Sequence, residues 1–260
     1  MNTLKLKSLL ITFIIIIALC FAGCSQQNIT LPNTSVPHFS TSNIEVTTTA
    51  AVPSTQAISR LEQWGLGKTE TEHISQNRSY EWYIDQWNTG YASGNNCGPS
   101  CAVMAAKWFD EDFQKTVEDA RDTFPNDGGW WYINNIYDFL TDNDIPCALK
   151  SNISLSSIKS EIKDGNILIF NINTEDIPYN YEEEQHTGKP YIGDFGHFII
   201  VKGYRVVDDT TFFEVYDPYG FDAKYSDGTL KCKDRYYLAD EVINSASGWC
   251  PEYLAILPKD

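Results

Sequence analysis

Three residues of the chain are of types that act together in nucleophilic catalysis: Cys97, His197 and Asp217. Cys97 lies in the stretch NNCGPSCAVMAAKWF, directly before a Gly-Pro pair and at the mouth of a segment with helical spacing. A thiol attacks as thiolate, and both a helix N-terminus and a neighbouring imidazolium stabilise that charge. Cys97 is therefore the candidate nucleophile, whereas Cys101, one turn further along, faces away from the positive end of the helix.

His197 and Asp217 belong to the stretch GHFIIVKGYRVVDDTTFFEVYDPYG, residues 196–220, which predicts two strands around a VDDT turn. If the turn is centred near Asp208, Asp217 returns beside the start of the first strand, close to His197. A carboxylate in that place fixes the imidazole tautomer and favours its protonated form. The spacing therefore predicts a base and its orienting acid.

Each of these residues also has a simpler interpretation. His197 alone is typical of a core histidine, and Asp217 before Pro218 is typical of a turn. Cys97 could be bonded to another cysteine, because four of the five cysteines beyond Cys24 could form two disulfides. Those five are Cys97, Cys101, Cys147, Cys232 and Cys250. No second close Cys or His pair follows Cys97 and Cys101, so we assign no metal.

Three motifs together, NNCGPSCAVMAAKW, FGHFIIVKGY and VYDPYG, resemble the papain-like cysteine peptidases that cut double-glycine leaders from bacteriocin precursors. The resemblance extends over roughly residues 80 to 257. It implies an α+β papain-like fold, in which a helical half with the nucleophile helix packs on a twisted antiparallel sheet. It also implies peptide-bond hydrolysis by a Cys97–His197–Asp217 triad without a cofactor.

The resemblance further implies a glutamine upstream of the nucleophile, whose amide donates to the tetrahedral oxyanion together with the cysteine N–H. Gln86 is the nearest candidate, eleven residues before Cys97, so the intervening segment must loop out. Asn88 and Asn96 are the alternatives for this position.

The remaining elements place helices before most of the strands, an order that indicates an α+β protein. Because both faces of the strand that begins near His197 are apolar, we expect it to be central in its sheet. The GGWW stretch at 128–131 either lines a substrate groove or packs a helix, and packing is favoured. Besides the helix at Cys97, helices are predicted at 115–124, 130–143 and 154–165, and further strands at 166–173 and 253–258.

The N-terminus has the features of an export signal: Lys5 and Lys7, a short apolar run, and the sequence FAGC. That ending looks like a lipoprotein signal, with residues 1–23 removed and Cys24 lipidated; the alternative is an ordinary signal peptide. Residues 24–58 are rich in Thr, Ser and Pro and predict a tether. Residues 59–260 are then the papain-like peptidase domain, held outside the cytoplasm on the bacterial membrane by the lipid.

The formal net charge of −16 argues against nucleic-acid binding, which requires clustered basic residues. The resemblance to cysteine peptidases implies a peptide or protein substrate. Two other functions fit the same residues: an acyltransferase of the transglutaminase kind, and a surface peptide-binding module without turnover. Incorporation of an added amine separates the first from hydrolysis, and an unreactive Cys97 would favour the second.

Overall fold

The computed structural model describes residues 59–259. The predicted signal peptide, the lipidation site Cys24 and the tether lie outside the described residues. Among residues 59–259, no helix combines the length and the apolar character that crossing a bilayer requires.

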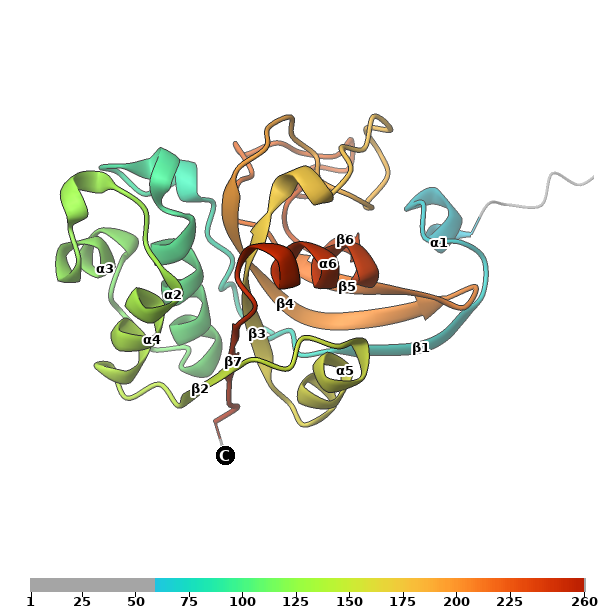
Figure 1. Cartoon of the computed structure of the whole chain (residues 1–260). Coiled ribbons are helices and arrows are strands. Elements are labelled where there is room, and N and C mark those ends of the chain that lie inside the picture. The colour runs from blue at the N-terminus through green and yellow to red at the C-terminus, as the bar shows by residue number, and fades with distance from the viewer. Residues whose placement is uncertain (1–58, 260) are drawn as a thin grey trace, which may run out of the picture. The chain divides into compact units, whose positions relative to one another are not determined.

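Seven strands in the described part of the chain form one antiparallel sheet, in which six follow the order β2-β7-β3-β4-β5-β6 and β1 pairs with β4 (Figure 1). The strands are β1 (Glu70–Ser75), β2 (Cys147–Lys150), β3 (Ile167–Asn173), β4 (Gly196–Val207), β5 (Thr210–Tyr216), β6 (Arg235–Leu238) and β7 (Tyr253–Ile256).

The predicted hairpin is confirmed as β4 and β5, which are joined through Asp208 and Asp209. Both turn residues have left-handed backbone, with φ of 48° and 62°, a conformation that aspartate tolerates better than most residues. Strand β4 is central, as expected, because it pairs with β3 near its start, with β1 near its end and with β5 along its other edge.

The helices cover both faces of this sheet, with α2, α3 and α4 gathered on one side and α5 and α6 on the other (Figure 1). The three helices predicted at 115–124, 130–143 and 154–165 all start and end inside these ranges. Capping sets two of the starts: α3 begins after Thr116, and α5 after Ser154, whose hydroxyls accept from the first turn. The helices are α1 (Arg60–Gln63), α2 (Cys97–Phe109), α3 (Val117–Thr123), α4 (Ile133–Thr141), α5 (Leu155–Lys163) and α6 (Ala239–Trp249).

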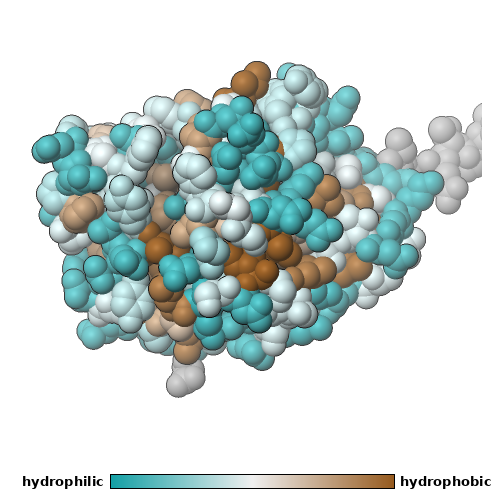
Figure 2. Space-filling model, in the orientation of Figure 1, coloured by the Kyte–Doolittle hydropathy of each residue, from teal (hydrophilic) through white to brown (hydrophobic). Residues whose placement is uncertain are grey.

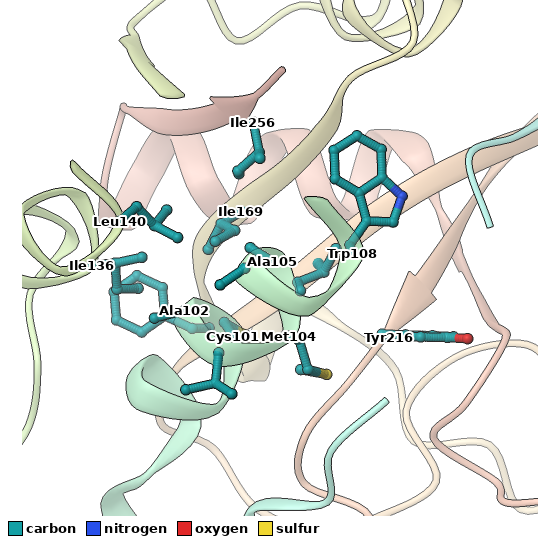
Figure 3. Close-up of a cluster of buried hydrophobic side chains, with 14 of the residues drawn as sticks. Cys101, Ala102, Met104, Ala105, Trp108, Ile136, Leu140, Ile169, Tyr216 and Ile256 are labelled. Atoms are coloured by element: carbon teal, nitrogen blue, oxygen red, sulfur yellow. The ribbon is translucent and has the colours of Figure 1, made fainter. Parts of the chain in front are cut away.

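Alternation along the central strands divides the apolar residues between two cores. Ile169 of β3 faces α2 and α4, together with Ile256 of β7, and Figure 3 shows Ile169 next to Ala105 of α2. A small residue at this helix position allows α2 to approach the sheet closely. The neighbouring Leu168 and Phe170 face α5 and α6 instead. This double burial explains the almost continuous apolar sequence of β3.

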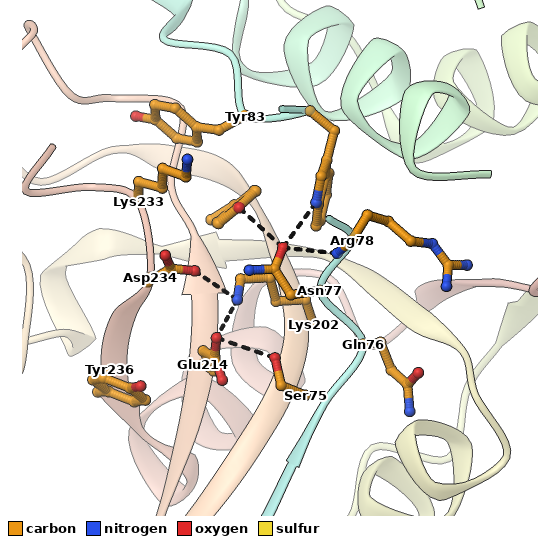
Figure 4. Close-up of polar contacts among 12 residues, drawn as sticks. Ser75, Gln76, Asn77, Arg78, Tyr83, Lys202, Glu214, Lys233, Asp234 and Tyr236 are labelled. Atoms are coloured by element: carbon orange, nitrogen blue, oxygen red, sulfur yellow. Dashed lines mark hydrogen bonds and ion pairs between the residues drawn. The ribbon is translucent and has the colours of Figure 1, made fainter. Parts of the chain in front are cut away.

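Strand β1 was not predicted, because its sequence ETEHIS lacks apolar alternation. Polar contacts fix it to the sheet: Ser75 donates to Glu214, which is paired with the fully buried amine of Lys202 (Figure 4). Asp234 completes the group at 2.7 Å from the same amine. A strand held by buried polar partners gives no hydrophobic pattern to recognise.

Helix α6 was also not predicted, since its sequence ADEVINSASGW is rich in residues of modest helix propensity. Tertiary contacts compensate, because the buried Ser245 hydroxyl donates to the Asn173 carbonyl and accepts from its N–H.

On the face shown in Figure 2, hydrophilic side chains cover most of the surface and hydrophobic ones gather near its middle.

Candidate active site

Cys97 is the first residue of α2, so the helix starts slightly earlier than its predicted run after Pro99. Pro99 occupies the first turn, where its missing N–H costs nothing. Gly98 is required by close packing: a Cβ there would lie 2.9 Å from Cβ of Trp131 and 3.4 Å from the ring of Phe198. The helix N-terminus therefore presses directly against β4, the strand that carries His197.

His197, the second residue of β4, is 1% exposed. Its Nε2 lies 2.7 Å from Oδ1 of Asp217, which follows β5 directly. The ring also shares the lining of one cavity with Cys97, whose thiol interacts with it and raises its pKa. Because Asp217 holds Nε2, Nδ1 is the nitrogen left for the sulfur. The structure thus brings the three sequence-predicted residues together from α2, β4 and the end of β5.

Asp217 is fully buried and its carboxylate is saturated with donors. Oδ1 accepts from the Tyr219 N–H at 2.8 Å, and Oδ2 accepts from the hydroxyls of Tyr191 at 2.9 Å and Tyr237 at 2.6 Å. Sequence reasoning missed both tyrosines. One lies in the loop before β4 and the other on β6, and no local motif marks either as a partner of Asp217.

The charges of these groups are mutually dependent. Burial alone would raise the pKa of the Cys97 thiol, but the hydrogen bond and charge of His197, with the N–H groups of Phe198 and Gly98, lower it. Burial would likewise lower the pKa of His197, but Asp217 and Cys97 raise it to about 10. The arrangement therefore favours a thiolate beside an imidazolium.

The same balance keeps Asp217 ionised. Burial would raise its pKa, but the charge and hydrogen bond of His197, the Tyr237 hydroxyl and the Tyr219 N–H hold the pKa below its ordinary value. Burial, followed by the Asp217 charge, raises the pKa of Tyr191 and Tyr237 well above the ordinary value. Both tyrosines therefore remain protonated hydrogen-bond donors.

A cavity of about 220 Å³ opens onto Cys97 and His197. Trp130 forms part of its wall and is 71% exposed, whereas Trp131 is buried in the core, so the expected packing role of the GGWW stretch is met by Trp131. The cavity is lined by Gln86, Gly94, Asn95, Cys97, Trp130, Phe195, Gly196, His197 and Tyr219.

Gln86 lies in this cavity wall, in the short 3-10 helix Gln86–Asn88, and is 1% exposed. Its Nε2 donates to the carbonyls of Ser93 at 2.9 Å and Gly94 at 3.3 Å. Its Oε1 is buried with no hydrogen-bond partner among the described residues. The side chain that the resemblance implies is therefore beside the nucleophile, with its donors turned to the backbone.

The two alternatives to Gln86 lie elsewhere. Asn88 donates to the carboxylate of Asp222 on the surface. Asn96 is fully buried and its amide is used by Thr89, Tyr91 and Arg121. Neither side chain lines the cavity.

All five cysteines of the described residues are free thiols, so the disulfides considered from their number are not formed there. Burial raises the pKa of Cys101 well above its ordinary value, and the charges of Cys97 and Asp217 act in the same direction. Its position in the apolar core beneath α2 makes it a packing residue (Figure 3). Within residues 59–259, no cluster of three or more His, Cys, Asp or Glu side chains could hold a metal ion.

A thiol on a helix N-terminus, facing a histidine and a carboxylate on an antiparallel sheet, defines the class of α+β proteins with a papain-like fold. The model of the Peptidase_C39 like family matches residues 71–241, and the chain belongs to this family. Membership in this family supports the assignment of the chain as a cysteine peptidase.

A solved structure from Bacillus anthracis, described as a C39-like peptidase, is 14% identical in sequence. The match covers 73% of this chain and 100% of that chain, with a TM-score of 0.45. No curated protein matches the chain.

Proposed function

We propose that this chain is a cell-surface cysteine peptidase that hydrolyses peptide bonds through Cys97, His197 and Asp217. The observation that carries the proposal is the position of the His197 ring, which is hydrogen-bonded to the Asp217 carboxylate and lines the same cavity as Cys97. Family membership supports the same chemistry.

In the proposed reaction the Cys97 thiolate attacks the substrate carbonyl carbon, and the carbonyl π electrons move to oxygen. The C–N bond then breaks as the His197 imidazolium gives its proton to the leaving amine, which leaves a thioester on Cys97. His197, now neutral, takes a proton from water as that water attacks the thioester. Collapse releases the acid and restores thiolate and imidazolium.

Asp217 orients the imidazole throughout and stabilises its charged form, and it does not itself need to accept the proton. We propose that Gln86 and the Cys97 N–H receive the oxyanion. For this role the Gln86 amide must release one backbone acceptor, and the Gly94 carbonyl, at 3.3 Å, is the more weakly held.

The N-terminal sequence supports the proposed location. An export signal ending in FAGC and a Thr/Ser/Pro-rich segment would place the domain outside the cell, tethered through lipid on Cys24. The substrate is then a peptide or protein that the tethered domain reaches at the surface.

Labelling with an epoxide-type thiol inhibitor tests the triad, followed by intact mass spectrometry and mapping of the modified residue. We expect a single label on Cys97 at pH 6 to 7, lost in Cys97→Ser and strongly slowed in His197→Ala. Cys147 is the matched control, because it is also half-buried but burial raises its pKa to about 11.

Label on Cys147 instead, or an equal rate in His197→Ala, would contradict the triad. A reactive Cys97 that transfers a peptide acyl group to an added amine, with no hydrolysis product, would replace the peptidase by an acyltransferase.

A further inference from the structure

Arg121 of α3 carries a buried positive charge close behind the nucleophile. The residue is 3% exposed. Its guanidinium donates from Nε and Nη2 to Oδ1 of Asn96, from Nη2 to the Asn95 carbonyl at 2.9 Å, and from Nη1 to the Gly129 carbonyl at 2.7 Å. Each of these acceptors is a neutral oxygen, whereas buried arginines are usually paired with carboxylates.

These contacts join two segments that form the cavity. Asn95 and Asn96 directly precede Cys97, and Gly129 directly precedes Trp130 in the cavity wall. One planar guanidinium therefore ties the turn before the nucleophile to the segment that carries Trp130, together with the Asn95 side chain, which contacts the Gly128 carbonyl and Trp130. Lysine cannot reproduce this pattern, because its single nitrogen lacks the fork of donors.

Arg121 also determines what the Asn96 side chain does. Asn96 is the N-cap residue of α2, and asparagine at this position commonly accepts a hydrogen bond from the helix N–H groups. Here the side chain makes no capping bond. Its oxygen accepts from Arg121, and its nitrogen donates to Thr89 and to the Tyr91 carbonyl.

The Asn96 side chain therefore leaves the N–H groups of Cys97 and Gly98, in the first turn of α2, unoccupied. The turn contains no acidic residue, and no side chain caps it. The Gly98 N–H is one of the groups that lower the pKa of the Cys97 thiol. If Asn96 turned back to cap the helix, its oxygen would compete with the sulfur for these donors.

Arg121 also carries its charge next to the turn that precedes Cys97. Burial lowers the pKa of Arg121, and the charges of Cys97 and Tyr91 act in the opposite direction. Solvent screens this interaction little, because Arg121 is buried. The other ionisable groups that act on Cys97 or beside it are His197 of β4, Cys101 of α2 and, beyond the imidazole, Asp217.

We propose that Arg121 is a positioning residue for the nucleophile: it holds the turn before Cys97 and keeps Asn96 away from the helix N–H groups, so that these groups and its own charge act on the sulfur. The inference rests on the proposed function, since it assigns a role in activating the proposed nucleophile.

The test is the rate of Cys97 alkylation by iodoacetamide between pH 4 and 9, followed by mass spectrometry. In Arg121→Met we expect the inflection to move upward by about one pH unit, which slows labelling below the inflection about tenfold. Arg121→Lys keeps the charge and should shift the inflection less than Arg121→Met. Asn96→Asp places a carboxylate against the guanidinium and should also move the inflection upward.

Arg235→Met is the matched control. Arg235 is 1% exposed and also donates only to neutral oxygens, the carbonyls of Gln185, Thr187 and Gly188 and the Tyr225 hydroxyl. Its loss should lower the free energy of unfolding without moving the inflection of Cys97.

Failure of the proposed function and failure of the Arg121 role give different results. A wild-type Cys97 that labels only with the inflection of an ordinary thiol would overturn the proposed function itself. A low inflection in wild type that is unchanged in Arg121→Met would overturn the role of Arg121 alone, and so would an equal shift in Arg235→Met. Should Arg121→Met not fold, Arg121→Lys decides: it keeps the charge but lacks the fork of donors, and an unchanged inflection would overturn the positioning role.

Discussion

The hydroxyl of Tyr237 donates a 2.6 Å hydrogen bond to Oδ2 of Asp217, a carboxylate with no exposed surface. This contact comes from the far edge strand β6 and lies on the side of Asp217 away from His197. A donor in this place stabilises the ionised carboxylate, which in turn stabilises the imidazolium. Tyr237 thereby links the edge of the sheet to the charge state of the nucleophile.

Tyr237→Phe keeps the ring and removes only the hydroxyl. We expect the free energy of unfolding to fall by about 1 to 3 kcal/mol near neutral pH, because a buried carboxylate loses a donor. Asp217 has a lowered folded pKa, so its contribution is present above the unfolded pKa and is lost as pH falls through the folded pKa. The variant should therefore lose activity at a higher pH on the acid side of the profile.

The measurement is urea unfolding together with the pH dependence of kcat/KM. Tyr204→Phe is the control, since Tyr204 is equally buried but its hydroxyl donates to Glu72. Tyr204→Phe should lower the free energy of unfolding and leave the acid side of the kcat/KM profile unchanged. An acid limb that stays unchanged in Tyr237→Phe would contradict the role of the hydroxyl.

The pH dependence of the free energy of unfolding should reveal whether the His197 ring is charged in the folded protein. The folded pKa of His197 is raised from 6.5 to about 10, so its stabilising contribution is complete below about pH 6.5 and is lost as pH rises toward 10. The difference in unfolding free energy between wild type and His197→Gln should shrink by at least about 1 kcal/mol between pH 6 and pH 10.

His186→Gln is the control, because burial lowers the pKa of His186 to about 4. The contribution of His186 is lost only as pH falls below the unfolded pKa. The difference in unfolding free energy between wild type and His186→Gln should therefore stay level from pH 8 to pH 10. A level difference for His197 would show that its ring is not charged in the folded protein.

Gln86→Ala tests the proposed oxyanion donor. If the amide stabilises the tetrahedral oxygen, kcat should fall about 100-fold to 1000-fold with little change in KM. Asn88→Ala is the comparison, since Asn88 contacts the surface carboxylate of Asp222, and its kcat should stay within about twofold of wild type. A loss of stability in Gln86→Ala with less than a tenfold loss of kcat would leave Gln86 a purely structural role.

Gly98→Ala should be destabilising although alanine is the better helix former. The added Cβ meets Cβ of Trp131 at 2.9 Å, so the start of α2 must move away from β4. We expect a loss of about 1 to 3 kcal/mol and a lower kcat, measured by urea unfolding and peptide hydrolysis.

Gly248→Ala in α6 is the matched helix substitution, because nothing lies within 4 Å of the added Cβ. It should stabilise the domain by up to about 1 kcal/mol. Equal changes in the free energy of unfolding at the two glycines would mean that the contact with Trp131 does not destabilise Gly98→Ala.

The proposed lipid anchor is tested at Cys24. Cys24→Ala should move the protein from the membrane pellet to the soluble or secreted fraction and remove the lipid mass from the N-terminal peptide. Cys20→Ala, within the proposed signal, should leave the protein in the membrane fraction. An unlipidated N-terminus in wild type would restore the alternative of an ordinary signal peptide.

The elements with a regular apolar pattern could be predicted from sequence, because their packing repeats along the chain. Strand β3 and the β4–β5 hairpin have such a pattern, and the latter places His197 and Asp217 at one end of two neighbouring strands. Strand β1 has none, and the apolar face of α6 is short, since Glu214 and Asn173 hold these two elements through polar contacts from distant segments.

The sequence by itself determined the local chemistry of Cys97, His197 and Asp217: a thiol before a helix, and an imidazole and a carboxylate on paired strands. Only the tertiary structure decided which groups surround them. Tyr191, Tyr237 and Arg121 come from a loop, an edge strand and another helix, and no spacing along the chain encodes those meetings. The physical reason is that hydrogen bonds to a buried charge depend on distance in space, which the packing of α2 against the sheet sets.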